Sequence, residues 1–231
     1  MASNVSYVFT PAPTPSLSVR GVAERFPVHR VYCIGRNYEA HAVEMGHDPN
    51  KEPPFFFQKN ASNVYVGQEF PYPSQTADVH HEIEMIAVLH QGGKDIAVAQ
   101  ALDCVFGYAV GLDMTRRDLQ GEAKKLGRPW EVGKAFEHSG PCTEIVRASE
   151  IGHPSQGEIW LQVNGEIRQQ GDLNQMIWKT AEQVSILSRF FTLQPGDVIF
   201  TGTPSGVGPV IKGDQLHGFV QGVGELRIKV I

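Results

Sequence analysis

The sequence predicts an α+β domain that is mainly β, with few short helices. It contains 24 glycines and 15 prolines among 231 residues, more than average usage, and these residues favour turns. Hydrophobic residues make up 41% of the chain, enough to fill a core, which excludes global disorder. Most apolar runs are short, and several alternate with polar residues, as half-buried strands do. Many short strands joined by turns are therefore expected.

The charge pattern and the cysteines exclude several classes of protein. The net charge is −5, and the 20 Lys and Arg residues form no run longer than two, so no nucleic-acid partner is expected. Cys33, Cys104 and Cys142 lie far apart and form no Cys-x-x-Cys pair, which argues against a zinc site or a disulfide framework. No apolar run approaches the ~20 residues of a membrane span, and no signal-peptide pattern is present at the N-terminus. We therefore expect a cytoplasmic protein with no membrane partner.

Residues 1–27 are expected to form an irregular N-terminal arm, because they hold four prolines and little periodicity. Residues 28–231 contain no linker or internal repeat and are expected to form a single domain. The strands predicted from apolar or alternating runs cover residues 28–34, 55–57, 82–89, 105–113, 197–201 and 225–231.

Two further elements have clear local signals. Asn164-Gly165 lies between two alternating runs and predicts a type I′ hairpin over residues 158–170. The best helix covers residues 181–193, where apolar residues recur with helical spacing. Thr180 and Gln183 are expected to form its capping box, and Pro195-Gly196 follows its end.

A pair of glutamates opens one of the apolar strands. Glu82 and Glu84 are two residues apart, so in a strand both side chains face the same way. Two adjacent buried carboxylates repel each other, and a divalent cation between them removes that repulsion. Asp113, which ends the run 105–112, is the next acid placed to join them. Three carboxylates suit Mg²⁺, Mn²⁺ or Ca²⁺ better than zinc; a solvated strand edge is the alternative.

A second acid–base pair lies on a short helix expected over residues 37–45, with Asn37 as N-cap and Gly46 as stop. His41 and Glu44 are three residues apart and share a face of that helix. A carboxylate beside an imidazole raises its basicity, which is how a water-activating base is built. The glycine-flanked helix suits a mobile lid, although a surface ion pair is the alternative.

Three cationic side chains stand in contexts that suit anion binding. Lys134 lies in an apolar segment, where a partly buried ammonium needs an anionic partner. Lys59, which follows three phenylalanines, admits the same interpretation, and surface exposure is the alternative for both lysines. Arg117 lies in a polar segment after a strand and has a guanidinium that can fork onto a carboxylate. The glycine-rich residues 201–208 offer backbone N–H groups to an anion, or form a plain turn.

Taken in order, these segments resemble the fumarylacetoacetate hydrolase family over about residues 28–231. The resemblance rests on five motifs: Gly35-Arg36-Asn37-Tyr38 with His41 and Glu44; His81-Glu82-Ile83-Glu84; Gly111-Leu112-Asp113-Met114-Thr115; Gly133-Lys134-Ala135-Phe136; and Thr201-Gly202-Thr203-Pro204-Ser205-Gly206. One departure is that Asn60, where the family often has proline, follows Lys59. The segments 25–27 and 45–49 resemble the branch that hydrolyses fumarylpyruvate or maleylpyruvate in gentisate breakdown.

The resemblance implies a mixed β-roll fold, a homodimer and a catalytic domain over residues 28–231. It implies that Glu82, Glu84 and Asp113 hold Mg²⁺ or Mn²⁺, that His41 and Glu44 form a lid-borne dyad that activates water, and that Lys134 lies beside the substrate. It further implies that Arg117, Gln120 and Thr203 contact the substrate. Either Arg117 or Lys59 is expected to hold the far carboxylate.

The activity expected from these residues is hydrolytic C–C cleavage of an acylpyruvate, above all fumarylpyruvate to fumarate and pyruvate. Within the family the alternatives are decarboxylation of oxaloacetate, or hydration or isomerisation of a 2-oxo acid. An alternative from another class is a non-catalytic β-module that binds Ca²⁺ or an anion. Such a module would need the three carboxylates but not the dyad or Lys134.

Overall fold

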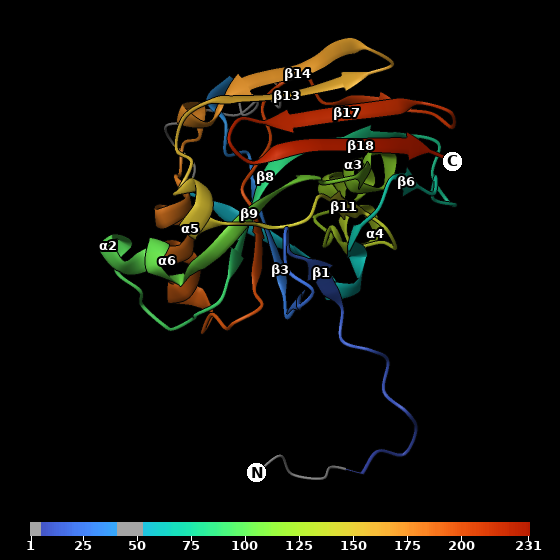
Figure 1. Ribbon diagram of the computed structural model, residues 1–231. Helices are drawn as coiled ribbons and strands as arrows, with labels where there is room; N and C mark the ends of the chain where they lie inside the picture. Colours follow the sequence, from blue (N-terminus) through green and yellow to red (C-terminus); the bar gives the residue numbers. More distant parts are fainter. Residues whose placement is uncertain (1–5, 41–52) are drawn as a thin grey trace.

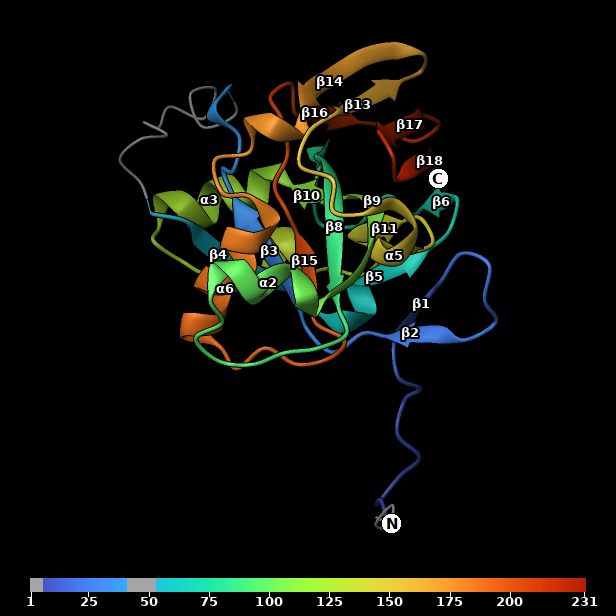
Figure 2. The ribbon, with the colours of Figure 1, turned by 60° about the vertical axis from the view of Figure 1, so that its left-hand side comes forward.

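The structure of the protein, a computed structural model, describes residues 6–40 and 53–231. A central sheet and a second sheet make up most of it, with short helices at the flanks and the N-terminal segment extending away from the body (Figures 1 and 2). This arrangement confirms the predicted α+β, mainly β, fold with few short helices. In the described part of the chain, no helix is long and apolar enough to cross a membrane.

The central sheet is mixed and follows the order β4-β3-β15-β8-β9-β11-β5, with β12 paired to β9. Its strands are β3 (Val31–Gly35), β4 (Phe55–Lys59), β5 (Val64–Val66), β8 (Ile83–Leu89), β9 (Val105–Leu112), β11 (Gly140–Cys142), β12 (Val146–Arg147) and β15 (Val198–Phe200). The long antiparallel pair β8–β9 lies at its middle.

The second sheet lies across β8 and β9 in the order β14-β13-β17-β18-β6 (Figure 1). Its strands are β6 (Glu69–Phe70), β13 (Glu158–Val163), β14 (Glu166–Asp172), β17 (Gln215–Val220) and β18 (Gly224–Val230). A three-stranded sheet combines β7 (Val79–His81), β10 (Thr115–Arg116) and β16 (Gly208–Val210).

Short helices cover the flanks of the central sheet. The α-helices are α2 (Val98–Ala101), α3 (Arg117–Lys125), α4 (Glu131–Lys134), α5 (Ala148–Ile151) and α6 (Thr180–Phe190). Single turns of 3-10 helix are η1 (Ala61–Asn63), η2 (Leu102–Cys104) and η3 (Leu173–Gln175). Of these helices, only α6 was expected from the sequence. In particular, α3 follows directly after β10, in the polar segment for which no helix was predicted.

The central position of strand β8 explains why its sequence is continuously apolar from Met85 to Leu89. All of its residues are buried, because the strand is covered on both faces. The odd-numbered residues, from Ile83 to Leu89, enter the larger core beneath the second sheet. Ile86 and Val88 enter a smaller core on the opposite face. A continuous apolar run therefore indicates a central strand here.

The N-terminal segment differs from the irregular arm that was expected. Residues 16–27 contain a two-stranded antiparallel sheet, formed by β1 (Ser16–Ser18) and β2 (Arg25–Pro27). Leu17 and Phe26 face the smaller core and are buried there. The strands were missed because three-residue strands are too short to show periodicity. The domain boundary after residue 27 stays a prediction.

All six predicted strands are present, and their ends differ from the prediction by at most three residues. The predicted type I′ turn is confirmed, since Asn164 (φ 54°) and Gly165 (φ 83°) both adopt left-handed conformations between β13 and β14.

Helix α6 is confirmed, but its predicted capping box is wrong. The Glu182 carboxylate accepts a hydrogen bond from the Lys179 N–H at 2.8 Å. Gln183 is instead buried, and its side chain donates to the carbonyl oxygens of Trp178 and Thr201 at 2.8 and 3.2 Å. The helix therefore begins one residue earlier than expected, at Thr180.

Candidate active site

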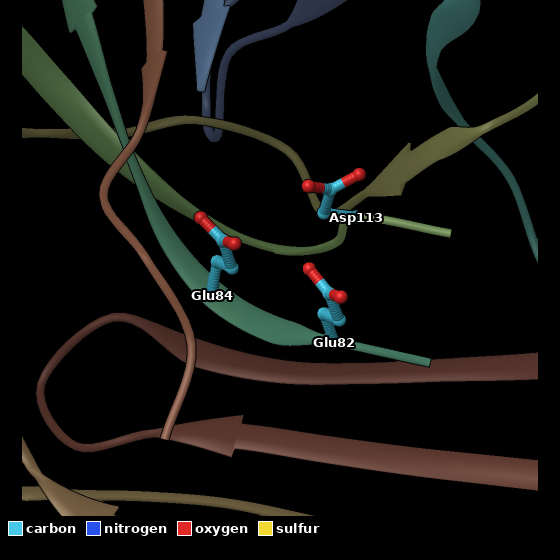
Figure 3. A group of neighbouring side chains, drawn as sticks. All are labelled: Glu82, Glu84 and Asp113. Atoms are coloured by element: carbon cyan, nitrogen blue, oxygen red, sulfur yellow. The ribbon is translucent and has the colours of Figure 1, made fainter. Parts of the chain in front are cut away.

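Three carboxylates converge where β8 begins and β9 ends. Glu84 lies in β8, Glu82 immediately precedes that strand and Asp113 immediately follows β9. The antiparallel pairing places Asp113 opposite Glu82, so that the Asp113 N–H donates to the Glu82 backbone oxygen at 2.9 Å. One carboxylate oxygen from each residue lies within 4.8 Å of the other two, and all three residues are buried (Figure 3).

Cationic side chains compensate two of these carboxylates. Lys134 Nζ, at the end of α4, lies 2.8 Å from Glu82 Oε2 and 2.8 Å from Asp113 Oδ2. Arg117 Nη2, at the start of α3, donates to Glu82 Oε1 at 2.5 Å. Lys59 Nζ, at the end of β4, lies 2.8 Å from Asp113 Oδ1. Burial alone would lower the pKa of Lys134, but the Asp113 and Glu82 charges raise it, so its side chain is a permanent cation.

Glu84 is the exception among the three acids. Its Oε2 accepts a hydrogen bond from the Gly202 N–H at 2.7 Å, and no Lys or Arg of the described residues forms an ion pair with it. Burial, together with the Asp113 and Glu82 charges, raises the pKa of Glu84 well above its ordinary value. A cation near Glu84 would reverse this unfavourable arrangement.

The oxygen atoms of this cluster suit a divalent cation. Asp113 Oδ1 is buried and lies 2.8 Å from the Lys59 ammonium, without the geometry of a hydrogen bond. Lys59 donates to the backbone oxygens of Met114 and Lys134. Asp113 lies next to Glu84, which forms no ion pair with a Lys or Arg of the described residues, and such a pair of carboxylates fits Mg²⁺ or Mn²⁺, which prefer oxygen ligands.

A cavity opens directly over the carboxylates. Glu82, Glu84 and Asp113 form one part of its wall, and Arg117, Gln120, Lys134 and Thr203 form another. Further lining side chains are Ile34, Arg36, Phe55, Phe57, Lys124 and Trp130. Arg117 also donates to Gln120 Oε1 at 2.7 Å, so these two side chains are held together on α3. The cavity is therefore lined by carboxylates in one part and by cationic and aromatic side chains in another.

The glycine-rich loop also contributes to the cavity. Thr203 lines the cavity, and its hydroxyl donates to the Ile83 oxygen at 2.7 Å and accepts from Gln169 Nε2 at 2.8 Å. At Gly202, φ is +101° and a Cβ would lie 2.6 Å from the Asn37 side chain, so the turn that aims its N–H at Glu84 requires glycine.

Gln169 was not singled out in the sequence, yet it fastens this loop. Its Oε1 accepts from the Ile83 N–H at 3.0 Å and contacts His81 Nδ1 at 2.9 Å, while its Nε2 also donates to the Pro204 oxygen. All hydrogen-bonding groups of its buried amide are used. The only signal in the sequence was its inward-facing position in the hairpin, which a polar residue seldom occupies.

Comparison with known proteins identifies this architecture. The model of the family described as fumarylacetoacetate (FAA) hydrolase C-terminal matches residues 30–231. The chain belongs to the fumarylacetoacetate hydrolase family. The expected resemblance and the family's fold are thereby confirmed.

Members of the family with solved structures are close to this chain. The fumarylpyruvate hydrolase of Pseudomonas aeruginosa, in complex with Mn²⁺ and pyruvate, is 53% identical, with a TM-score of 0.96 over 98% of this chain and 99% of that one. A putative fumarylpyruvate hydrolase of Burkholderia cenocepacia is 47% identical, with a TM-score of 0.92 over 98% of each chain. The mitochondrial oxaloacetate tautomerase of Bos taurus is 39% identical over 87% of this chain and 90% of its own length.

Three of the residues expected from the family resemblance need separate comment. His41 and Glu44, the expected dyad, lie outside the described residues. Lys59 is fully buried behind Asp113 and does not line the cavity, so its position argues against contact with a far carboxylate and favours a role in holding Asp113. The sequence could not separate these roles, because a lysine after three phenylalanines fits both.

Proposed function

We propose that this protein is a metal-dependent hydrolase that cleaves a C–C bond of an acylpyruvate, with fumarylpyruvate as substrate and fumarate and pyruvate as products. The observation that supports this most is the cavity itself, where three buried carboxylates face Lys134 and Arg117. The 53% identity to a fumarylpyruvate hydrolase supports the choice of substrate.

In this proposal Glu82, Glu84 and Asp113 hold Mg²⁺ or Mn²⁺. When bound, such an ion polarises the oxygens of a 2-oxo acid and fixes their orientation. Arg117 and Gln120 line the same part of the cavity and would orient the substrate through hydrogen bonds, as would Thr203.

Hydrolysis requires a water to add to the acyl carbonyl that lies farther from the pyruvoyl end. The C–C bond between that carbonyl carbon and the methylene carbon of the pyruvoyl half then breaks. The acyl half leaves as a carboxylic acid, and the electron pair remains on the pyruvoyl half, which takes up a proton. Lys134 is buried and cationic, and it is placed to offset the negative charge that develops there. His41, supported by Glu44, is the base proposed to activate the water.

A second candidate is the interconversion of the tautomers of oxaloacetate, or its decarboxylation. Relatives named oxaloacetate tautomerases, 39% identical to this chain, support it, since oxaloacetate has the same 2-oxo acid group. That chemistry needs no attacking water, so the dyad favours hydrolysis. We further propose a homodimer that acts in the cytoplasm in aromatic catabolism of the gentisate type.

The decisive experiment is a substrate panel of acylpyruvates and oxaloacetate, assayed with Mg²⁺ and with Mn²⁺. We expect loss of the enol absorbance of fumarylpyruvate with release of pyruvate. His41→Ala should impair this hydrolysis far more than any reaction of oxaloacetate. A folded, metal-loaded protein that turns over no acylpyruvate would reject the proposed function, and activity on oxaloacetate alone would favour the second candidate. A protein that binds metal but transforms no 2-oxo acid would be the non-catalytic module.

A further inference from the structure

The cationic side of the cavity contains two residues that the proposed mechanism does not use. Lys124 and Arg36 both line the cavity, together with the aromatic rings of Phe55 and Trp130. We propose that Lys124, assisted by Arg36, binds a second carboxylate at the far end of the substrate. The enzyme would then select acylpyruvates whose acyl group ends in a carboxylate over those with an uncharged acyl group. This inference rests on the proposed function and specifies its substrate class.

Helix α3 sets the distance between the two ends of such a substrate. Arg117, Gln120 and Lys124 lie at positions i, i+3 and i+7, so they share the helix face that lines the cavity. Arg117 contacts Glu82 at the metal end, and Lys124 lies seven residues, about 10 Å, farther along the helix. A short chain with a carboxylate at each end fits this separation.

Lys124 forms no ion pair with an Asp or Glu of the described residues, and its side chain is half-buried. Its Nζ lies 5.0 Å from the centroid of the Trp130 ring. Burial first, and then the nearby Arg117 and Arg36 charges, lower the pKa of Lys124 to about 8. An anion bound beside Lys124 would offset the burial and the charge repulsion that act on this side chain.

Arg36 approaches the same region from the end of β3. It has a positive φ of 56°, which is uncommon for a residue other than glycine. Its guanidinium lies 5.0 Å from the centroid of the Phe55 ring. The Phe55 and Trp130 rings are themselves 5.5 Å apart, edge to face, and form an apolar part of the cavity wall beside these cations. Such a wall suits a flat, conjugated acyl chain.

The test compares two substrates that share the pyruvoyl end: fumarylpyruvate, which has the second carboxylate, and acetylpyruvate, which does not. Lys124→Met should raise the KM for fumarylpyruvate about 10- to 100-fold, the effect of losing one charge-assisted hydrogen bond. The KM for acetylpyruvate should change less than about threefold. Lys125→Met is the matched control, since Lys125 is the next residue on α3, is exposed and does not line the cavity.

A binding measurement separates the subsite from turnover. Calorimetry with fumarate should show binding to the wild type in the presence of Mn²⁺, and crotonate, which lacks one of the two carboxylates, should bind more weakly. Lys124→Met should lose this preference, and Lys124→Arg, which keeps the charge, should retain it. Thermal melts establish that each variant is folded.

The outcomes distinguish the two proposals. If the wild type hydrolyses neither acylpyruvate, the proposed function fails. If it hydrolyses both but Lys124→Met affects them equally, or affects neither, the second-carboxylate subsite is rejected. A wild type that binds fumarate no better than crotonate would also reject the subsite.

Discussion

The two ends of the cavity differ in whether their cationic side chains form ion pairs. At the metal end, Glu82 and Asp113, which lie next to the ends of β8 and β9, are compensated by Lys59, Lys134 and Arg117. Glu84 on β8 is buried beside them and forms no ion pair with a Lys or Arg of the described residues. At the other end, Lys124 on α3 is half-buried and has no acid partner among the described residues. A fold can afford an unpaired cation only where water or a ligand reaches it, whereas buried charges must be paired.

This comparison implies that cations at the two ends have different tasks. Those at the metal end form ion pairs with buried carboxylates and hold them in place, so their loss should reduce stability or metal affinity. Those at the open end should affect only the recognition of charged substrates. Variants at each end can therefore break or sharpen the comparison.

The largest effect is expected from Lys59→Met. This change leaves Asp113 buried beside its remaining partner, Lys134, and removing one member of a buried ion pair costs about 3–5 kcal/mol. Urea unfolding of the metal-free protein should show this loss. The loss should shrink when Mn²⁺ is present at saturation, because the ion supplies the missing positive charge.

Lys94→Met is a suitable control, because Lys94 is exposed and should cost within about 0.5 kcal/mol. If Lys59→Met left the free energy of unfolding unchanged but raised the KM for fumarylpyruvate alone, Lys59 would be a substrate ligand after all. The contrast between the two ends would then disappear.

The next largest effect is expected from Glu84→Ala. Because Glu84 forms no ion pair with a Lys or Arg in the described part of the chain, removing it should take away a metal ligand without leaving one of those cations unpaired. We expect the affinity for Mn²⁺, measured by calorimetry, to fall about 100-fold or more, and hydrolysis to fall with it. Glu122→Ala, an exposed acid on α3, should change neither. Unchanged Mn²⁺ affinity in Glu84→Ala would contradict the metal assignment.

The sequence predicted the parts of this molecule that depend on local patterns. The pairing of β8 with β9 follows from two long apolar runs, and Glu82, Glu84 and Asp113 stand at their ends, so their convergence could be expected. The turn at Asn164-Gly165 has a direct conformational cause.

The parts that the sequence did not predict depend on contacts between distant segments. Gln169 fastens a loop more than 30 residues away, and no local pattern reveals such a partner. The β1–β2 pair depends on the smaller core that it covers. Lys124 was overlooked because no helix was predicted over residues 117–125, and only a helix places it on the same face as Arg117 and Gln120.

The smallest expected effect concerns the pH dependence of substrate recognition at Lys124. The pKa of Lys124 is lowered to about 8 by burial and by the Arg117 and Arg36 charges, with Lys134 adding to this and Glu82 opposing it. Below that pH the side chain is a cation, and above it the cation is lost. The KM for fumarylpyruvate should therefore rise between pH 7 and pH 9, by up to about tenfold, since roughly a tenth of the lysines stay protonated one pH unit above the pKa.

Steady-state kinetics with two substrates and two proteins isolate this effect. Acetylpyruvate reports any change in the pyruvoyl end, the metal or the base, so its KM should not show the added rise. In Lys124→Arg the side chain stays charged throughout this pH range. The KM of this variant for fumarylpyruvate should therefore change with pH no more than its KM for acetylpyruvate does. If the variant kept the wild-type rise, the titrating group would lie elsewhere. Lys124 would then share the permanent charge of the compensated cations at the metal end.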